Sequence, residues 1–297
     1  MMFGAIDVGT NSVRLLITDD NLQAKERVIK TTRLGEGVNQ NQFLLPEACF
    51  RTISALGEMK EIARNYSLQH LPVVATSAVR DAANRDFFLN AVQDRLNLSV
   101  DVITGEREAY LTYLGVTADF ISEAEKILVF DLGGGSTEII LGQDKKILEL
   151  HSLDVGAVRM TERFLAVSST EYNCSLVKEF TRSLLHPYLE RYSKVGKIIG
   201  VGGTATSLAA MQQHLVPYDP KKVHGFRLNL AEVKNIRQKL ALMSVEERGK
   251  WPGLQSKRAD IILGGVLIAE TLLEELQMTE FTVSENDLLL GLIIEQS

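Results

Sequence analysis

The chain has 297 residues, a length that suggests two domains of ordinary size. Its hydrophobic fraction of 45% and charged fraction of 24% exclude a disordered, collagen-like or low-complexity protein. Because 32 basic residues stand against 38 acidic ones, the net charge is −6, and we expect neither DNA nor a membrane as a partner. No basic segment precedes the first apolar residues, and the longest uncharged apolar stretch, residues 261–269, is too short to cross a bilayer. We therefore expect a cytoplasmic protein that holds any anionic ligand with local cations and backbone amides.

The first predicted feature is a pair of strands joined by a glycine turn that begins with an aspartate. Residues 3–6 (FGAI) run into Asp7 and the turn DVGTNS, after which residues 13–18 (VRLLIT) form the second strand. In chain order there follow a helix over residues 46–64, a strand centred on Val73 and Val74, a helix over 86–96 capped by Asp81 or Asn84, a strand beginning at Val100, and a helix from Thr104 to about Leu114.

The strand and turn at the N-terminus return later in the chain. Residues 127–130 (ILVF) run into Asp131, 124 positions after Asp7, and the turn DLGGGST and the strand EIILG follow. A second pair of strands repeats at nearly the same spacing, because Val73 has a counterpart at Ile198, 125 positions later. Two pairs at nearly one offset indicate two versions of one α/β unit. This duplication predicts a functional site in a cleft between the two versions.

Turns of this composition are suited to phosphate, because glycines let backbone N–H groups approach an anion closely. Side-chain donors are also present in the two turns, at Thr10, Asn11, Ser12, Ser136 and Thr137. The aspartates that open the turns would repel a phosphate unless a divalent cation, most plausibly Mg²⁺, lay between them. The plainer interpretation is a pair of tight hairpins in which aspartate is only a turn former. The sequence contains neither the GxxxxGK[ST] phosphate loop nor the HExxH zinc motif.

Four further side chains are candidates for phosphate chemistry, each with a plainer interpretation. Arg80 precedes a capped helix and could share an anion with its first N–H groups, or it pairs with Asp81 at the surface. Arg258 is either a phosphate ligand or a helix-end charge. Glu108 is either a catalyst or a surface carboxylate that suits the helix dipole. His224 is either a phosphate contact or a structural histidine.

Segments spread over nearly the whole chain resemble a known family. They are DVGTNSVRL at Asp7, RLGEGV at Arg33, ATSAVRDAAN at Ala75, TGEREAYLTYLGV at Thr104, DLGGGSTEI at Asp131, GAVRMTE at Gly156, GVGGTATSLAA at Gly200, HGF at His224 and GLQSKRADIILGG at Gly253. The family is the Ppx/GppA group of exopolyphosphatases and guanosine pentaphosphate phosphohydrolases, within the sugar kinase, Hsp70 and actin superfamily.

The resemblance implies an α/β fold of two actin-like (ribonuclease H-like) domains with a cleft between them. Domain I is expected over residues 1–117, joined by a C-terminal helix at 285–297, and domain II over residues 118–284. The general base of the family falls on Glu108, with Glu106 as a neighbour. The predicted phosphate-binding residues are Thr10, Asn11, Ser12, Arg80, Gly133, Gly134, Ser136, Thr137, Gly203, Thr204 and Arg258, and the predicted metal ligands are Asp7, Asp131 and Glu138.

The predicted activity is hydrolysis of the terminal phosphoanhydride of inorganic polyphosphate, of guanosine pentaphosphate, or of both. Water activated by Glu108 would attack with the assistance of Mg²⁺ or another divalent cation. Two alternatives stay open at this point: an alarmone or polyphosphate sensor without catalysis, and an ATP-dependent small-molecule kinase of the same superfamily. The choice between the two substrates and the existence of a homodimer stay open as well.

Overall fold

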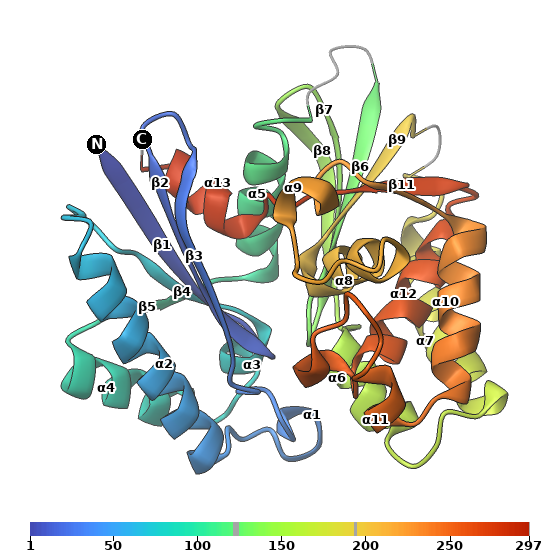
Figure 1. Cartoon of the computed structure of the whole chain (residues 1–297), viewed down its shortest axis with the longest axis horizontal. Coiled ribbons are helices and arrows are strands. Elements are labelled where there is room, and N and C mark those ends of the chain that lie inside the picture. The colour runs from blue at the N-terminus through green and yellow to red at the C-terminus, as the bar shows by residue number, and fades with distance from the viewer. Residues whose placement is uncertain (121–124, 193–194, 297) are drawn as a thin grey trace. The chain divides into compact units, whose positions relative to one another are not determined.

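The computed structural model describes residues 1–120, 125–192 and 195–296. The chain divides into two compact units (Figure 1). Unit 1 comprises residues 1–115 together with the C-terminal stretch from residue 288, and unit 2 comprises residues 116–287. The chain therefore passes from one unit to the other twice.

Unit 1 contains a five-stranded mixed sheet with the order β3-β2-β1-β4-β5. β1 pairs antiparallel with β2 and parallel with β4, and β2 and β3 are antiparallel while β4 and β5 are parallel. The strands are β1 (Met2–Val8), β2 (Ser12–Asp19), β3 (Ala24–Thr31), β4 (Val73–Ala75) and β5 (Val100–Val102). Its helices are α1 (Val38–Asn41), α2 (Pro46–Arg64), α3 (Ser77–Arg80), α4 (Arg85–Leu96), α5 (Gly105–Val116) and α13 (Leu288–Ile294).

Strand alternation builds two cores on opposite faces of this sheet. Ile6 and Val8 of β1 belong to a core shared with α2 and α4, whereas Ala5 belongs to a core shared with α5 and α13. Figure 1 shows the first pair of helices and the second pair on opposite faces of the sheet. Asn84 stands at the N-cap of α4, as one of the two expected capping residues, but its side chain makes no capping bond. Instead, Oδ1 of Asn84 accepts the N–H of Leu44 at 2.8 Å, and its Nδ2 donates to the carbonyl of Leu44 at 3.0 Å.

Unit 2 contains a six-stranded mixed sheet with the order β10-β11-β9-β6-β7-β8. Its strands are β6 (Lys126–Leu132), β7 (Thr137–Gln143), β8 (Lys146–Leu153), β9 (Lys197–Val201), β10 (Arg227–Asn229) and β11 (Glu280–Val283). Its α-helices are α6 (Ala157–Met160), α7 (Glu171–Leu185), α8 (Gly202–Gln212), α9 (Pro220–Val223), α10 (Leu230–Leu242), α11 (Val245–Arg248) and α12 (Ile262–Glu275). A π-helical turn (Thr161–Leu165) and 3₁₀ turns at His186–Tyr188 and Ser256–Arg258 complete it.

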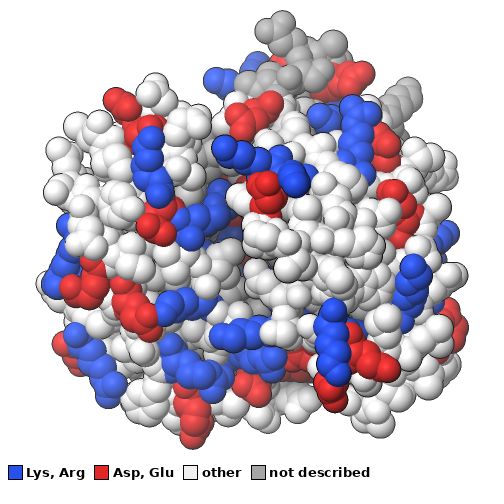
Figure 2. Space-filling view, viewed as in Figure 1, with Lys and Arg blue, Asp and Glu red and all other residues white. Residues whose placement is uncertain are grey.

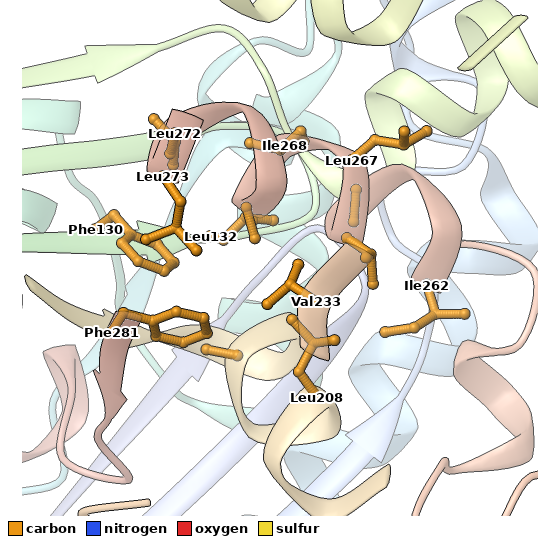
Figure 3. Close-up of a cluster of buried hydrophobic side chains, with 14 of the residues drawn as sticks. Phe130, Leu132, Leu208, Val233, Ile262, Leu267, Ile268, Leu272, Leu273 and Phe281 are labelled. Atoms are coloured by element: carbon orange, nitrogen blue, oxygen red, sulfur yellow. The ribbon is translucent and has the colours of Figure 1, made fainter. Parts of the chain in front are cut away.

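The core of unit 2 forms around α12, which is buried along most of its length. Figure 3 shows its leucine and isoleucine side chains between Phe130 of β6, Leu208 of α8 and Val233 of α10. Phe130 and Phe281 meet edge to face with ring centroids 5.2 Å apart. This explains why the apolar stretch at 261–269, too short to span a bilayer, is so hydrophobic: it lies in the centre of a domain.

The predicted duplication is present in the topology of the two sheets. β6, β7, β8 and β9 repeat the pairing of β1, β2, β3 and β4, including the switch from antiparallel to parallel neighbours. Asp7 lies opposite Val74 across β1 and β4, and Asp131 lies opposite Val201 across β6 and β9. The equivalent of Val74 is therefore Val201, so the second offset is 127 and not the expected 125. The predicted α/β fold class, built from two versions of one unit, is confirmed.

A buried carboxylate joins three helices of unit 2. The side chain of Glu270 in α12, 1% exposed, accepts hydrogen bonds from Lys178 of α7 at 2.9 Å and from Arg237 of α10 at 3.2 Å. One turn later, Glu274 lies 2.8 Å from Lys178 and 2.7 Å from Lys234. These ion pairs bind α7 and α10 to the central helix.

Acidic and basic side chains are interspersed over the face of the molecule shown in Figure 2. This distribution agrees with the modest net charge of −6. No helix in the described part of the chain combines the length and the apolar content needed to cross a membrane.

Candidate active site

The first glycine turn, between β1 and β2, is held from one side by the segment that follows β3. The N–H of Gly35 donates to the carbonyl of Thr10 at 2.8 Å, and the N–H groups of Thr32 and Arg33 donate to the carbonyl of Asn11 at 3.1 and 3.0 Å. In a trans peptide the N–H points opposite to the carbonyl. The N–H groups that follow these carbonyls, those of Asn11 and Ser12, therefore point away from the supporting segment.

The second turn, between β6 and β7, is supported in the same way by the segment that follows β8. The N–H groups of Ala157 and Val158 donate to the carbonyls of Gly133 and Gly134 at 3.0 and 2.8 Å. Arg159 continues the series with its side chain, because its Nε donates to the carbonyl of Gly135 at 2.6 Å. The peptide N–H groups of residues 134–136 are consequently directed to the opposite side, which is the arrangement that an anion-binding turn needs.

The predicted side-chain donors of the turns have different local partners. The hydroxyls of Thr10 and Ser77 lie 2.8 Å apart. Asn11 is buried, and its Nδ2 has no hydrogen-bond partner among the described residues. Ser12 is half-buried and Ser136 is buried. The hydroxyl of Thr137 donates to the carbonyl of Val155 at 2.5 Å, which uses its one proton.

The aspartates that open the two turns have opposite surroundings. Asp7 pairs across the strands with Arg14, whose Nε and Nη2 both donate to its Oδ2 at 2.9 and 2.7 Å. Asp131 pairs across the strands with Glu138, which lies 124 positions after Arg14. Both of these carboxylates are buried, and Glu138 accepts a hydrogen bond from Ser152 at 2.7 Å. Unit 1 therefore neutralises its aspartate with a cation, and unit 2 places a second acid beside it.

The start of α8 brings together four of the predicted residues of unit 2. A Cβ at Gly203 would lie 2.0 Å from Nη1 of Arg258, so only glycine leaves room for the guanidinium over the first turn of this helix. A Cβ at Gly202 would lie 2.9 Å from Oδ1 of Asp131. Thr204 is fully buried, and its hydroxyl has no hydrogen-bond partner among the described residues. Carboxylate, guanidinium and helix N-terminus are thus neighbours within one unit.

Glu108, the predicted base, lies in the first turn of α5 and is 8% exposed. Nη1 of Arg80 donates to its Oε2 at 3.2 Å and to the carbonyl of Ile103 at 3.0 Å. Arg80 also lies 3.9 Å from Asp81, so both the surface pair and a contact with the predicted base are present. Glu106 is exposed, and the pKa of its carboxyl is lowered by its own backbone N–H and then by the Thr104 hydroxyl.

Two arginines close to the turns were missed by the sequence analysis. Arg14 could have been found because it lies seven positions after Asp7, at the cross-strand position of a two-strand hairpin. Arg159 lies in the GAVRMTE segment, from which no residue had been selected. Its guanidinium supports the second turn and also lies 3.7 Å from Asp154.

His224 lies in unit 2, among residues close in sequence to the two points where the chain crosses between the units. Its Nδ1 accepts the N–H of Glu285 at 3.2 Å, and its Nε2 lies 3.7 Å from Asp119. Its ring centroid is 4.9 Å from that of Phe120. These contacts fit the structural interpretation of this histidine.

Within the described residues, no group of three or more histidine, cysteine, aspartate or glutamate side chains is arranged to hold a metal ion. Magnesium does not need such a cage, because it usually keeps several waters and binds one or two carboxylates together with substrate phosphates. Asp131 and Glu138, which lie directly across from each other on β6 and β7, could serve as such carboxylates. Asp7, already bonded twice by Arg14, fits it less well.

Comparison with known proteins decides the family. The model of the Ppx/GppA phosphatase family matches residues 16–296. The chain belongs to this family. The family predicted from the sequence is thereby confirmed.

Individual Ppx/GppA relatives agree with this assignment. Exopolyphosphatase 2 of Mycobacterium tuberculosis is 35% identical over 309 residues, covering 98% of this chain and 97% of that protein. A bifunctional 3-dehydroquinate synthase/phosphatase of Fusobacterium nucleatum is 36% identical over 307 residues; the chain spans only 46% of that longer relative. The crystal structure of an exopolyphosphatase from Cytophaga hutchinsonii matches 100% of this chain and 97% of its own, with a TM-score of 0.92 and 28% identity.

Proposed function

We propose that this Ppx/GppA protein hydrolyses the terminal phosphoanhydride of inorganic polyphosphate, of guanosine pentaphosphate, or of both, and releases orthophosphate. The observation that carries the proposal is the buried carboxylate of Glu108 in the first turn of α5, held 3.2 Å from Arg80. A buried carboxylate beside a polyanion repels it, so this group needs a chemical purpose. The names of the relatives support the same class of reaction.

Glu108 would act as the general base. A water molecule loses a proton to the Glu108 carboxylate and attacks the terminal phosphorus, and the bond from that phosphorus to the bridging oxygen breaks. The shortened chain leaves with the bridging oxygen, and the terminal group leaves as orthophosphate. Glu106 is a poorer candidate because its carboxylate is exposed, whereas that of Glu108 is buried, and because hydrogen bonds lower the pKa of Glu106.

Backbone amides and arginines would hold the phosphate groups. The N–H groups directed away from the supporting segments of both turns are suited to non-bridging oxygens, as is the first turn of α8. Arg258, packed over Gly203, would add a guanidinium there. The buried donors of Asn11 and Thr204 that have no partner among the described residues are further candidates for these oxygens.

Asp131 and Glu138 would hold the divalent cation, with Asp7, which Arg14 already binds, as a weaker candidate ligand. When bound, Mg²⁺ would neutralise charge on the substrate oxygens. Two adjacent buried carboxylates favour a cation between them because each raises the electrostatic cost of the other.

The test is phosphate release by the purified protein with Mg²⁺, on inorganic polyphosphate and on guanosine pentaphosphate in parallel. We expect turnover on at least one substrate, and loss of most of it in Glu108→Gln. Tight binding of either substrate without phosphate release would overturn the hydrolase proposal and favour a sensor. Transfer of phosphate from ATP to a small molecule would favour a kinase.

A further inference from the structure

The C-terminal helix α13 and Glu295, the residue that follows it, contact α5 at Arg107 and Leu111, which come before and after Glu108 in the sequence. On one side, the guanidinium of Arg107 forms a bidentate pair with the carboxylate of Glu295, with Nη1 at 2.7 Å from Oε1. On the other side, a Cβ at Gly291 would lie 1.8 Å from the carbonyl oxygen of Leu111. The backbones of the two helices are therefore in direct contact, and only glycine permits it.

Helix geometry relates these contacts to the direction of the predicted base. Arg107 and Leu111 are four residues apart and lie on one face of α5. Glu108 follows Arg107 by one residue, so its side chain leaves the helix about 100° further round the axis. On that side it meets Arg80, which is itself fixed to the carbonyl of Ile103. One face of α5 is thus held by α13 while the neighbouring face presents the carboxylate.

Apolar packing seats α13 in the same place. Leu288, Leu289, Leu292 and Ile293 share a core with Leu111 and with Ile103, the residue whose carbonyl binds Arg80. The salt bridge is partly exposed, and such pairs by themselves contribute little to stability. The salt bridge resists rotation of α5, because the contact at Gly291 already holds α5 at a fixed distance from α13.

We infer that α13 fixes the rotation of α5 about its own axis, and through it the direction in which Glu108 points. Gly291 and Glu295 are therefore positioning residues for the hydrolysis proposed above, on which this inference rests. Catalytic geometry is sensitive to such support, because a displacement of about 1 Å far from the chemistry can lower a rate by about 10²-fold.

Three variants test the inference through kinetics. Glu295→Gln keeps the shape and removes the ion pair, and we expect kcat to fall roughly three- to tenfold with KM unchanged. The reversed pair, Arg107→Glu with Glu295→Arg, should recover most of that loss, whereas either reversal alone should not. Gly291→Ala forces the helices about 1 Å apart, and kcat should fall toward about 10²-fold if the variant folds. The matched control is Glu61→Gln, which breaks an exposed Arg64 pair on α2 and should leave kcat and KM unchanged.

Amide hydrogen exchange over residues 105–116 provides a readout that does not depend on activity. We expect faster exchange there in Glu295→Gln and protection restored in the reversed pair. Unchanged exchange, or faster exchange with normal kcat, would overturn the inference. If Glu108→Gln is fully active while Glu295→Gln loosens α5, the failure lies in the proposed base and the contact between the helices stands.

Discussion

Glu108→Gln is expected to lower kcat by about 10²–10⁴-fold, the contribution typical of a general base. This corresponds to about 3–5 kcal/mol of lost transition-state stabilisation. Substrate binding should be retained or improved, because the variant removes a negative charge next to the site of a polyanion. KM is therefore expected to stay the same or to fall.

The structure separates this effect from a loss of folding. Glutamine keeps an oxygen at the position where Arg80 donates from 3.2 Å, so the contact survives as a hydrogen bond to a neutral group. Hydrogen bonds to charged groups contribute about 1.5–3 kcal/mol and neutral ones about 0.5–1.5 kcal/mol, so the expected cost in stability is about 1 kcal/mol. A cost of that size leaves the variant folded at 25 °C and is smaller than the expected kinetic effect.

The assay is steady-state phosphate release from polyphosphate, with thermal denaturation of the same samples to show that they are folded. Glu106→Gln is the matched control, because Glu106 occupies the same helical turn but is exposed. Its kcat should stay within a few-fold of the unchanged protein. Near-normal kcat in Glu108→Gln, or loss of activity in Glu106→Gln alone, would refute the assignment of the base.

Three further predictions follow from contacts within the units. Excess EDTA should abolish phosphate release. Glu138→Gln should raise the Mg²⁺ concentration needed for half-maximal activity more than Asp7→Asn does, because Arg14 already compensates the charge of Asp7. If Asp7→Asn had the larger effect, the cation would have to be assigned to unit 1. Arg258→Ala should raise KM more than Arg80→Lys does. Gly203→Ala should have the same effect as Arg258→Ala, because a Cβ at residue 203 would displace the guanidinium. A normal KM in both Arg258→Ala and Gly203→Ala would show that Arg258 does not bind substrate. Burial raises the pKa of Glu274, but hydrogen bonds from Lys178 and Lys234 outweigh burial and lower this pKa overall. The ion pairs of Glu274 therefore stabilise the fold at pH values above the ordinary glutamate pKa, and this contribution is lost as the pH falls through the lowered pKa. The Tm difference between Glu274→Gln and the unchanged protein, measured from pH 7 to pH 3, should shrink on the acid side, and a constant difference would contradict this.

The parts of the fold that could be predicted are those in which local pattern and tertiary environment agree. β1 and β6 are apolar runs that end in an aspartate, and both are buried strands as expected. β3 was not predicted because it is an edge strand with charged, exposed residues at Ala24–Thr31, where alternation is weak. The offset between β4 and β9 is 127 and not 125 because hydrogen bonds between strands set the register. Matching the two segments by composition does not detect those bonds.

The candidate site divides in the same way. Turn glycines and the first-turn carboxylates of α5 are local features and could be predicted from the sequence. The contact between Gly203 and Arg258 joins residues 55 positions apart, and the supporting bonds from the segments after β3 and β8 are equally remote from their turns. Such contacts exist only after the sheet has formed, so the sequence contains the residues but not their pairing.

The duplicated turn differs between the two units at one decisive position. Arg14 and Glu138 occupy equivalent places on the second strand, each directly across from the aspartate that opens the turn. In unit 1 the cross-strand pair is neutral, because the Arg14 guanidinium compensates the Asp7 carboxylate. In unit 2 the pair is two buried carboxylates, and each raises the electrostatic cost of the charge on the other. Under the function proposed above, this exchange of one charge between equivalent strand positions predicts a division of labour, in which the turn of unit 1 would bind phosphate directly and that of unit 2 would bind it with the help of a cation.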